Sequence, residues 1–576
     1  MRTLTSLFSH SRPTLHLSYK RFPPIRSLST LPNLPLFQAI KNHNESNPAV
    51  VHSASTRSFT YGNLVADILQ QKEKLAQTAG DGVKGERIAF LAENSYDYVV
   101  MLLSILASNA IALPLSPSFP TGELKYIMNN SRAKVLLSTE KFENKATQIV
   151  EAGLEREPRI EVMKKILKGG SVENLEFEDL KDQAGGMMLY TSGTTSRPKG
   201  VLISQSALTA QAASLLKAWK YSPQDRLLHL LPLHHIHGTV NAILTPIVAG
   251  SSIEFMYPFN PDAVWNRLAA PFTGEQKEKI TFLTAVPTIY NRLMSTFSDL
   301  PQETQTAAKE AISPQNLRLN ISGSAALPTP TKQKWTDLSG GNILLERYGM
   351  TEVGMAISCG LDPKDRVDGS VGWPLPSVET RLVDTTTNEV IRPGDEVDAD
   401  GRERDGEIQL RGPTIFTEYW NNPSATAEAF VPGDDGKGNW FKTGDIATRR
   451  LVPSAGKGES GSWATGMMYF IQGRKSVDII KTGGEKVSAL EVERELLSLP
   501  QINEAAVVGV PSEKWGQKVV AIVVLNDEVA NKTGKGGKPW NALNMRRDLQ
   551  DRVAPYKIPH EMKVVKEIPK NAMGKG

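Results

Sequence analysis

The sequence predicts an α/β protein with a large N-terminal domain of layered α/β sheets, a β-rich subdomain and a small α+β C-terminal domain. Three observations carry this prediction. The chain of 576 residues exceeds the size at which one hydrophobic core stops growing. Short apolar segments alternate with longer helical patterns in its first two thirds. From about residue 370 the pattern changes to strands punctuated by glycine and proline.

The N-terminal part has the alternation that is typical of largely parallel sheets. A helical pattern covers residues 97–110, and the whole apolar stretch 98–115 is interrupted by Ser104, Ser108 and Asn109. Because a membrane span needs about 20 nearly unbroken apolar residues, this stretch predicts a buried helix followed by a strand. Short apolar strands are predicted within 87–94, 134–140, 225–233, 251–258 and 280–288.

The last two units follow each other directly. We place the N-terminal domain at residues 35–473, with its β-rich subdomain at about 370–473, and the C-terminal domain at 474–576. In the latter, Ser488 as N-cap and Glu491 three residues later predict the start of a helix over 491–499. Strands over 505–511 and 519–526, a helix over 541–553 and a strand over 561–569 complete it.

The composition is that of an ordinary globular protein, with 40% apolar and 22% charged residues. Cys359 is the one cysteine of the sequence, so an intrachain disulfide and a cysteine-based metal cluster are excluded and a reducing compartment is expected. The formal net charge is +4, but residues 1–44 carry six basic and no acidic residues, which leaves −2 for the rest. The body therefore offers no basic surface for nucleic acid.

The basic head predicts an organelle transit peptide over residues 1–34. It is rich in arginine and serine, free of acids, and has leucine and phenylalanine interspersed. It lacks the continuous apolar segment of a secretory signal. The mitochondrial matrix is the predicted location; the alternatives are the cytoplasm or a plastid, and a disordered basic tail is the alternative for the head.

Residues 190–200, YTSGTTSRPKG, form a polar loop between two apolar segments. Hydroxyls, glycines and one lysine at such a place supply hydrogen-bond donors and a cation, which suits phosphate. The P-loop pattern does not fit, because Pro198 and Gly200 flank Lys199 where that pattern has Gly and Ser or Thr. A polar hairpin loop without a ligand is the alternative.

Seven motifs follow one another in the sequence, at residues 190–200, 231–238, 321–328, 346–352, 440–445, 473–493 and 568–575. In this order and approximate spacing the chain resembles the adenylate-forming acyl-CoA synthetases over residues 35–576. The segments LPLHHIHGTVNA, SGSAALP, LLERYGMTE, RKSVDIIKTGGEKVSALEVE and APYKIP are most similar to those of the mitochondrial malonyl-CoA synthetases within that family.

The resemblance implies a two-step ligation that uses ATP, Mg²⁺ and coenzyme A. The carboxylate of the acid attacks the α-phosphate of ATP to give an acyl-adenylate and pyrophosphate, and the thiolate of coenzyme A then displaces AMP. Positioning and charge neutralisation dominate catalysis of such phosphoryl chemistry. No membrane span and no nucleic-acid partner are expected, and the oligomeric state is not predicted.

By the same resemblance, Thr351 would bond the α-phosphate and Glu352 would hold Mg²⁺, which prefers oxygen ligands. Asp445 and Arg474 would reach the ribose. Gripping of the β- and γ-phosphates falls to Thr191, Ser192, Gly193, Thr194, Thr195 and Lys199. Adenine would be contacted by Gly323, Ser324 and Ala325. The remaining residues implied for ATP binding are Tyr348, Gly349 and Met350.

The C-terminal domain is implied to be mobile. Lys575 would bridge the carboxylate and the α-phosphate in the first step, and the domain would then swing about a hinge at Lys475 or Ser476. That movement would bring Gly483 and Gly484 to the pantetheine arm of coenzyme A, because glycine permits close backbone approach. Relatives usually continue past the Gly-Lys pair, so a shortened C-terminal end is also an expectation.

His234, His235 and His237 raise the question of a zinc site. Neighbouring residues on an extended segment point to opposite faces, so His234 and His235 are not expected to share one ion. The resemblance implies instead that His235 is a catalytic-site residue that gates the acyl pocket. A packed core histidine is the alternative.

The identity of the acid depends on an arginine. A dicarboxylate such as malonate has a second charge that must be paired when it is buried, and arginine matches a carboxylate with two hydrogen bonds. Arg292 and Arg347 are the candidates, with a structural salt bridge as the alternative for either. The predicted function is malonate–CoA ligation, with methylmalonate as a further acid. The alternatives are a short- or medium-chain monocarboxylate ligase and a non-catalytic acyl-AMP or coenzyme A binding protein.

Overall fold

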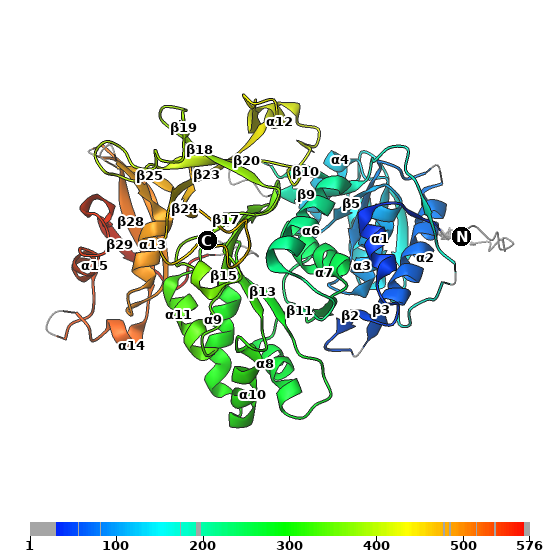
Figure 1. Cartoon of the computed structure of the whole chain (residues 1–576), viewed down its shortest axis with the longest axis horizontal. Helices are drawn as coiled ribbons and strands as arrows, with labels where there is room; N and C mark the ends of the chain where they lie inside the picture. Colours follow the sequence, from blue (N-terminus) through cyan, green and yellow to red (C-terminus); the bar gives the residue numbers. More distant parts are fainter. Residues whose placement is uncertain are drawn as a thin grey trace, which may run out of the picture.

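The structure is a computed structural model that describes residues 30–569 except 56, 81, 173, 192–196, 476–477, 483–484, 514 and 535–536. Among the described residues the fold contains two large sheets with helices around them, a six-stranded sheet and a five-stranded sheet, which confirms the α/β class. In Figure 1 the first large sheet lies on the right, the six-stranded sheet at the top and the C-terminal elements on the left.

The first large sheet has seven strands in the order β21-β10-β9-β5-β4-β6-β7. Its interior pairs are parallel, whereas β9 and β10 form an antiparallel hairpin that brackets the polar loop. The strands are β4 (Arg87–Leu91), β5 (Ile111–Pro114), β6 (Val135–Thr139), β7 (Arg159–Met163), β9 (Gly186–Thr191), β10 (Lys199–Ser204) and β21 (Glu418–Tyr419).

The second large sheet has nine strands in the order β17-β16-β15-β14-β13-β11-β12-β2-β3. The six strands from β15 to β2 are parallel, so their carboxyl ends share one edge, where ligands of open α/β sheets bind. The strands are β2 (Pro48–His52), β3 (Ser58–Thr60), β11 (Arg226–His229), β12 (Ser252–Phe255), β13 (Phe282–Ala285), β14 (Leu319–Ser322), β15 (Leu345–Met350), β16 (Gly354–Ser358) and β17 (Trp373–Pro374).

Helices cover both large sheets (Figure 1). The apolar stretch forms a fully buried helix that begins at the N-cap Ser95 and is followed by β5, as predicted. None of the described helices combines the length and apolarity that crossing a membrane requires. The helices of this part are α1 (Pro35–Asn42), α2 (Tyr61–Ala79), α3 (Tyr96–Ala107), α4 (Thr121–Ser131), α5 (Glu143–Glu151), α6 (Gln205–Trp219), α7 (Thr245–Ala249), α8 (Pro261–Ala269), α9 (Pro287–Thr296), α10 (Gln302–Ile312) and α11 (Thr329–Leu338).

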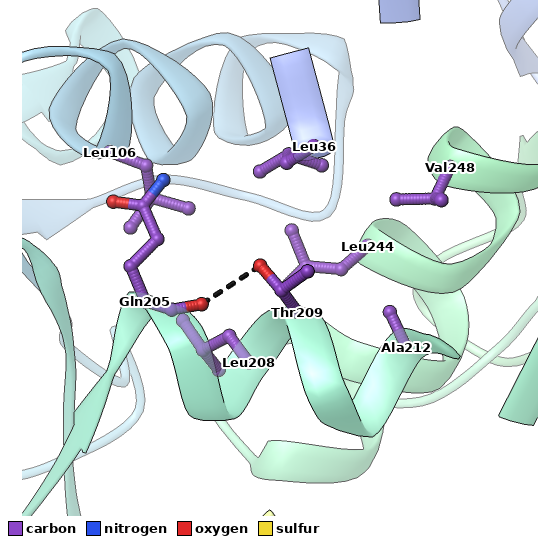
Figure 2. A pocket seen from close by; sticks show the side chains of 8 residues that line it. All are labelled: Leu36, Leu106, Gln205, Leu208, Thr209, Ala212, Leu244 and Val248. Atoms are coloured by element: carbon purple, nitrogen blue, oxygen red, sulfur yellow. Dashed lines mark hydrogen bonds between the residues drawn. The ribbon is translucent and has the colours of Figure 1, made fainter. Parts of the chain in front are cut away.

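One helix between the two large sheets has an unusual geometry. The π-helix η2 (His237–Leu244) leads directly into α7, and all its side chains are buried. Figure 2 shows a small pocket between α1, α3, α6, η2 and α7 whose lining is apolar except for Thr209 and the amide of Gln205. Because no charged side chain lines this pocket, it does not suit an anion.

The later strands form two smaller sheets. The six-stranded sheet consists of β18 (Glu379–Asp384), β19 (Val390–Ile391), β20 (Gly406–Arg411), β22 (Phe430–Val431), β23 (Trp440–Arg450) and β24 (Met468–Arg474), with α12 (Pro423–Ala429) beside it. The five-stranded sheet consists of β25 (Ile479–Thr482), β26 (Glu485–Ser488), β27 (Ile502–Ser512), β28 (Gly516–Leu525) and β29 (Glu561–Val564). It packs with α13 (Ala489–Leu497), α14 (Asp527–Ala530) and α15 (Ala542–Asp548) around its own hydrophobic core.

Side chains of the C-terminal elements contact the rest of the molecule, and Lys486 and Arg494 are examples. Lys486 Nζ donates to Thr385 Oγ1 at 3.1 Å and lies 3.4 Å from Asp405 Oδ2. The guanidinium of Arg494, on α13, packs against Gly369, where an added Cβ would collide with it. These contacts hold the C-terminal sheet against the body in the observed orientation.

The short strand β1 (Thr30–Pro32) falls within the segment that was predicted as a transit peptide. It pairs in parallel with β8 (Glu176–Glu178), and Leu31 and Leu34 are buried in the main core. Residues 30–34 therefore contribute to the folded domain, while residues 1–29 lie outside the described part of the chain.

His52 gives the fold a predictable pH dependence. It is buried at the end of β2, its Nε2 accepts the backbone N–H of Tyr96 at 3.1 Å, and burial followed by the charge of Arg57 lowers its pKa to about 4. Between pH 6.5 and 4, His52 is largely protonated in the unfolded chain and largely neutral in the folded protein. The free energy of unfolding therefore falls as the pH falls. From pH 6.5 to 5 the wild type should lose about 2 kcal/mol more than His52→Gln.

Urea unfolding of both proteins at the two pH values measures this difference. The other histidines are present in both proteins, so their contributions cancel. An equal loss of stability in both would contradict the assignment to His52.

Candidate active site

The polar loop 190–200 opens from the β9–β10 hairpin. Thr191 and Lys199 face each other across the hairpin in register. The ammonium of Lys199 lies 4.8 Å from the ring centroid of Tyr419, and it takes part in no ion pair among the described residues. Four of the residues expected to grip phosphate, Ser192, Gly193, Thr194 and Thr195, lie outside the described residues. The hairpin thus presents an unpaired lysine beside the loop.

Glu352 lies in the turn between β15 and β16, directly after the half-buried Thr351. Its Oε1 accepts the phenolic hydrogen of Tyr419 at 2.9 Å. Burial raises the pKa of Glu352, and this effect outweighs the opposing hydrogen bond from Tyr419 and the charge of Arg474. A divalent ion would offset that cost, so the residue fits the role of a magnesium ligand. Tyr419 connects Glu352 with Lys199.

Asp445 and Arg474 are paired in register on β23 and β24. Arg474 Nε donates to Asp445 Oδ1 at 3.2 Å, and the hydroxyl of Tyr348 donates to Asp445 Oδ2 at 2.7 Å. Both oxygens of the carboxylate are thereby oriented. The structure brings together three of the residues predicted for nucleotide binding, although they are far apart in the sequence.

Two further positions predicted for the ATP site, Gly349 and Ser324, have unusual backbone requirements. A Cβ at Gly349 would collide with the carbonyl oxygen of Gly354, so the β15–β16 hairpin that ends in Met350 requires glycine there. Ser324 follows β14 with a φ of 68°, a conformation that is costly for a residue other than glycine and that is concentrated at functional sites. Gly323 before it is buried, and Ala325 after it is exposed.

Arg347 is buried on the side of β15 that faces η2, with 6% of its surface exposed. Its Nη2 donates to His237 Nδ1 at 2.9 Å and to Ser324 Oγ at 3.2 Å, while Nε has no partner. Burial lowers its pKa to about 10, and no carboxylate pairs with it among the described residues. A buried arginine without a carboxylate partner among the described residues has the chemistry to bind an anion.

The tautomer of His237 follows from these contacts. Burial and, to a smaller extent, Arg347 lower its pKa well below the ordinary value, so the ring is neutral. Its Nδ1 receives hydrogen bonds from Arg347 and from Asn241 Nδ2 at 2.9 Å, hence the proton sits on Nε2. That Nε2–H has no partner within the described structure. Arg347 and His237 therefore offer neighbouring unused donors.

Arg292, the other candidate for the acid, has a different environment. It lies on α9 with an exposed side chain, and its guanidinium stacks over Phe259 at 4.8 Å from the ring centroid. Among the described residues, Arg292 takes no part in the hydrogen bonds around Arg347. The prediction required a buried arginine to pair with the distal carboxylate. Of the two candidates, Arg347 is buried and Arg292 is exposed.

The expectation about His234 and His235 is wrong in its geometry. Their ring centroids are 4.3 Å apart, because residues 233–235 form a turn before η2 and not an extended segment. His234 also contacts Phe119 edge-on at 5.7 Å, and burial lowers its pKa to about 3. Across the described ranges, no group of three or more histidine, cysteine or acidic side chains is placed to hold a metal ion.

The predicted hinge and coenzyme A residues are described only in part. The backbone N–H of Lys475 donates to the carbonyl oxygen of Gly444, on β23, at 2.9 Å. Ser476, Gly483, Gly484 and Lys575 fall outside the described residues.

Sequence reasoning missed two residues of the site. Tyr419 belongs to no quoted motif, and its position beside Lys199 and Glu352 arises from the pairing of β21 with β10. His237 was considered only as a zinc ligand. The signal that could have found it is the buried arginine of the ERYGMTE motif, which needs an acceptor once it enters the core.

Comparison with known proteins agrees with this geometry. The family profile of the AMP-binding enzyme matches residues 36–420, and that of the AMP-binding enzyme C-terminal domain matches residues 491–575. A CoA ligase of Gibberella moniliformis is 56% identical over 94% of this chain and 92% of its own length. The mitochondrial malonate–CoA ligase ACSF3 of Homo sapiens is 38% identical over 90% of this chain and 86% of its own length.

Among solved structures, ATP-bound MatB from Rhodopseudomonas palustris is similar with a TM-score of 0.73 and 28% identity, over 94% of this chain and 96% of that one. The profile matches cover more than half of the chain, in the order that the motifs predict. The chain therefore belongs to the AMP-binding enzyme family and is an AMP-forming acyl-CoA ligase.

Proposed function

We propose that this enzyme is an ATP-dependent malonate–CoA ligase that also accepts methylmalonate. The observation that carries the proposal is the buried guanidinium of Arg347, which has no carboxylate partner among the described residues and lies beside the unused Nε2–H of His237. A malonate-type acid reacts through one carboxylate and offers the second one to these donors.

The cost of an unpaired charge supports a dicarboxylate over a monocarboxylate. A buried cation without a partner is strongly unfavourable, whereas a carboxylate bound to it restores the balance. A monocarboxylate with an alkyl tail would leave Arg347 unpaired and would place apolar atoms against its donors. Methylmalonate adds one methyl group, a difference that a pocket discriminates by only about 1–3 kcal/mol.

The names of similar proteins point the same way. Malonate–CoA ligase is the name of the human relative and of a relative from Arabidopsis thaliana. The more similar fungal relative is named only as a CoA ligase, so the acid is inferred here from the pocket.

The residues predicted from the motifs have a consistent place in the proposed reaction. Lys199, with Thr191 and the loop residues up to Thr195, would neutralise the β- and γ-phosphates, and Glu352 would hold Mg²⁺ beside Thr351. Asp445 and Arg474 would fix the ribose, with adenine near Gly323, Ser324 and Ala325 and the hairpin of Tyr348, Gly349 and Met350 closing the site. Magnesium supplies charge neutralisation when bound.

The reaction then follows the two-step scheme. An oxygen of one malonate carboxylate bonds to the α-phosphorus while the bond to the β-phosphate oxygen breaks, and pyrophosphate leaves. The thiolate of coenzyme A next attacks the acyl carbon, and AMP leaves with the oxygen that it shared. We assign Lys575 to the first step, Gly483 and Gly484 to coenzyme A binding, His235 to gating of the acyl pocket and Lys475 or Ser476 to the hinge.

The mitochondrial matrix is the proposed location, supported by the acid-free basic head and by relatives whose names include mitochondrial. A fluorescent fusion of the full chain should coincide with a matrix marker in its source cells. Residence in the cytoplasm or a plastid would contradict this location without touching the enzyme activity.

A substrate panel tests the proposed activity. The full chain is incubated with ATP, Mg²⁺, coenzyme A and each of malonate, methylmalonate, acetate and octanoate, and mass spectrometry follows acyl-AMP and acyl-CoA separately. Malonyl-CoA should dominate, with methylmalonyl-CoA second. Thioester formed from acetate or octanoate alone would leave the family assignment standing and refute the malonate assignment.

Arg347→Met tests the observation on which the proposal depends. Loss of a charge-assisted pair in a buried site costs about 3–5 kcal/mol, so kcat/KM for malonate should fall by at least a hundredfold. Arg292→Met is the matched variant and should change kcat/KM by less than about threefold, as expected for an exposed residue. A large loss with Arg292→Met and a small loss with Arg347→Met would transfer the distal carboxylate to Arg292.

A further inference from the structure

We propose that Thr284 and His229 form the floor of the acid pocket and determine which acids the enzyme accepts. This inference rests on the proposed function, because it concerns the group at the far end of the acid. Neither residue belongs to a motif that predicted the nucleotide site or the two candidate arginines.

The register of four parallel strands places these residues on the same face as Arg347. His229 pairs with Thr284, Thr284 pairs with Ile321, and Ile321 pairs with Leu345. Paired residues of a sheet point to the same face, and Arg347 follows Leu345 by two residues, so it points there as well. The row His229, Thr284 and Arg347 thus faces η2, from which His237 reaches Arg347.

The row also lies at the edge of the sheet where a ligand is expected. His229 is the last residue of β11, and Thr284 is the last but one of β13. Both are fully buried, whereas Ser324, on the loop after β14, is half-exposed. His229 and Thr284 are therefore closed to solvent while Ser324 is partly open to it, so we infer that the acid enters on the side of Ser324 and that the two buried residues form the floor.

Thr284 supplies a hydrogen-bond donor that nothing in the described chain uses. Its Oγ1 is completely buried and has no partner. His229 packs edge-on against Phe255 at 5.7 Å between ring centroids, and burial lowers its pKa to about 4, so it adds a neutral polar ring. Buried polar groups of native proteins are normally satisfied, so a ligand or its water is expected to complete this set.

The chemistry of the floor predicts its selectivity. A carboxylate at Arg347 can also accept a hydrogen bond from the Thr284 hydroxyl, directly or through one water. An alkyl group in the same place leaves that hydroxyl buried and unpaired, so the floor disfavours monocarboxylates. Arg347 supplies the charge and Thr284 the neutral donor.

Competition between malonate and butyrate tests the floor, because butyrate has an ethyl group where malonate has its second carboxylate. Thr284→Val keeps the shape and removes the hydroxyl, so the ratio of kcat/KM for malonate to that for butyrate should fall about tenfold, the scale of one buried hydrogen bond. Thr284→Ser keeps a hydroxyl and should retain most of the wild-type ratio.

Thr245→Val is the matched control. Thr245, at the start of α7, is equally buried and its hydroxyl is equally without a partner, but it lies eight residues along the helical segment from His237. Its replacement should leave the ratio unchanged. Thermal melting of the three variants separates a change in selectivity from a loss of folded protein.

The outcomes distinguish the inference from the function on which it rests. A wild-type enzyme that makes no malonyl-CoA would overturn both. A wild type that makes malonyl-CoA, with Thr284→Val and Thr245→Val giving the same ratio, would overturn the floor and leave the malonate assignment intact. A shift with Thr284→Val that Thr284→Ser restores supports the floor.

Discussion

A positive charge buried without a carboxylate partner among the described residues is the interaction on which the proposed acid-binding side of this enzyme depends. Alternation along β15 produces it, because Arg347 points toward η2 while its neighbour Glu346 points to the opposite face. There Glu346 meets Lys332 at 3.0 Å, so the carboxylate next in sequence is already paired and is not available to the arginine. Separation of two adjacent charges onto two faces keeps one of them free for a substrate.

The surroundings of Arg347 are arranged to tolerate that charge. Gly323 leaves room for the guanidinium, since a Cβ there would lie 2.5 Å from its Nε. The guanidinium of Arg347 donates hydrogen bonds to Ser324 Oγ and to His237 Nδ1. The backbone of Ser324 is in the left-handed conformation. The strain at Ser324 is therefore linked to the pocket and not to the sheet. The nucleotide side uses the opposite device, in which Asp445 is held by both Tyr348 and Arg474 before any ligand arrives.

The sequence was sufficient for the class of the fold and for most of its strands, because hydrophobic periodicity and capping act locally: the buried helix α3 and the start of α13 at Ser488 are found where they were predicted. It failed where tertiary contacts decide. The helix predicted over 541–553 ends at Asp548, before the turns that lead to Pro555. The tilted contact between the rings of His234 and His235, and the contact of Tyr419 with Glu352, depend on a turn and on a strand pairing that periodicity does not encode.

The π-helix η2 adds a constraint on length to those on residue type. His237 is its first residue; successive residues of an α-helix are rotated by about 100°, and those of the wider π-helix by less. Shortening the segment by one residue would restore ordinary helical winding and turn the imidazole away from Arg347, although every side chain of the site would still be present. During the evolution of such an enzyme, deletion of a single codon within η2 would thus separate His237 from Arg347. The loss of activity would be comparable to that caused by loss of a catalytic residue, although the composition of the protein would scarcely change.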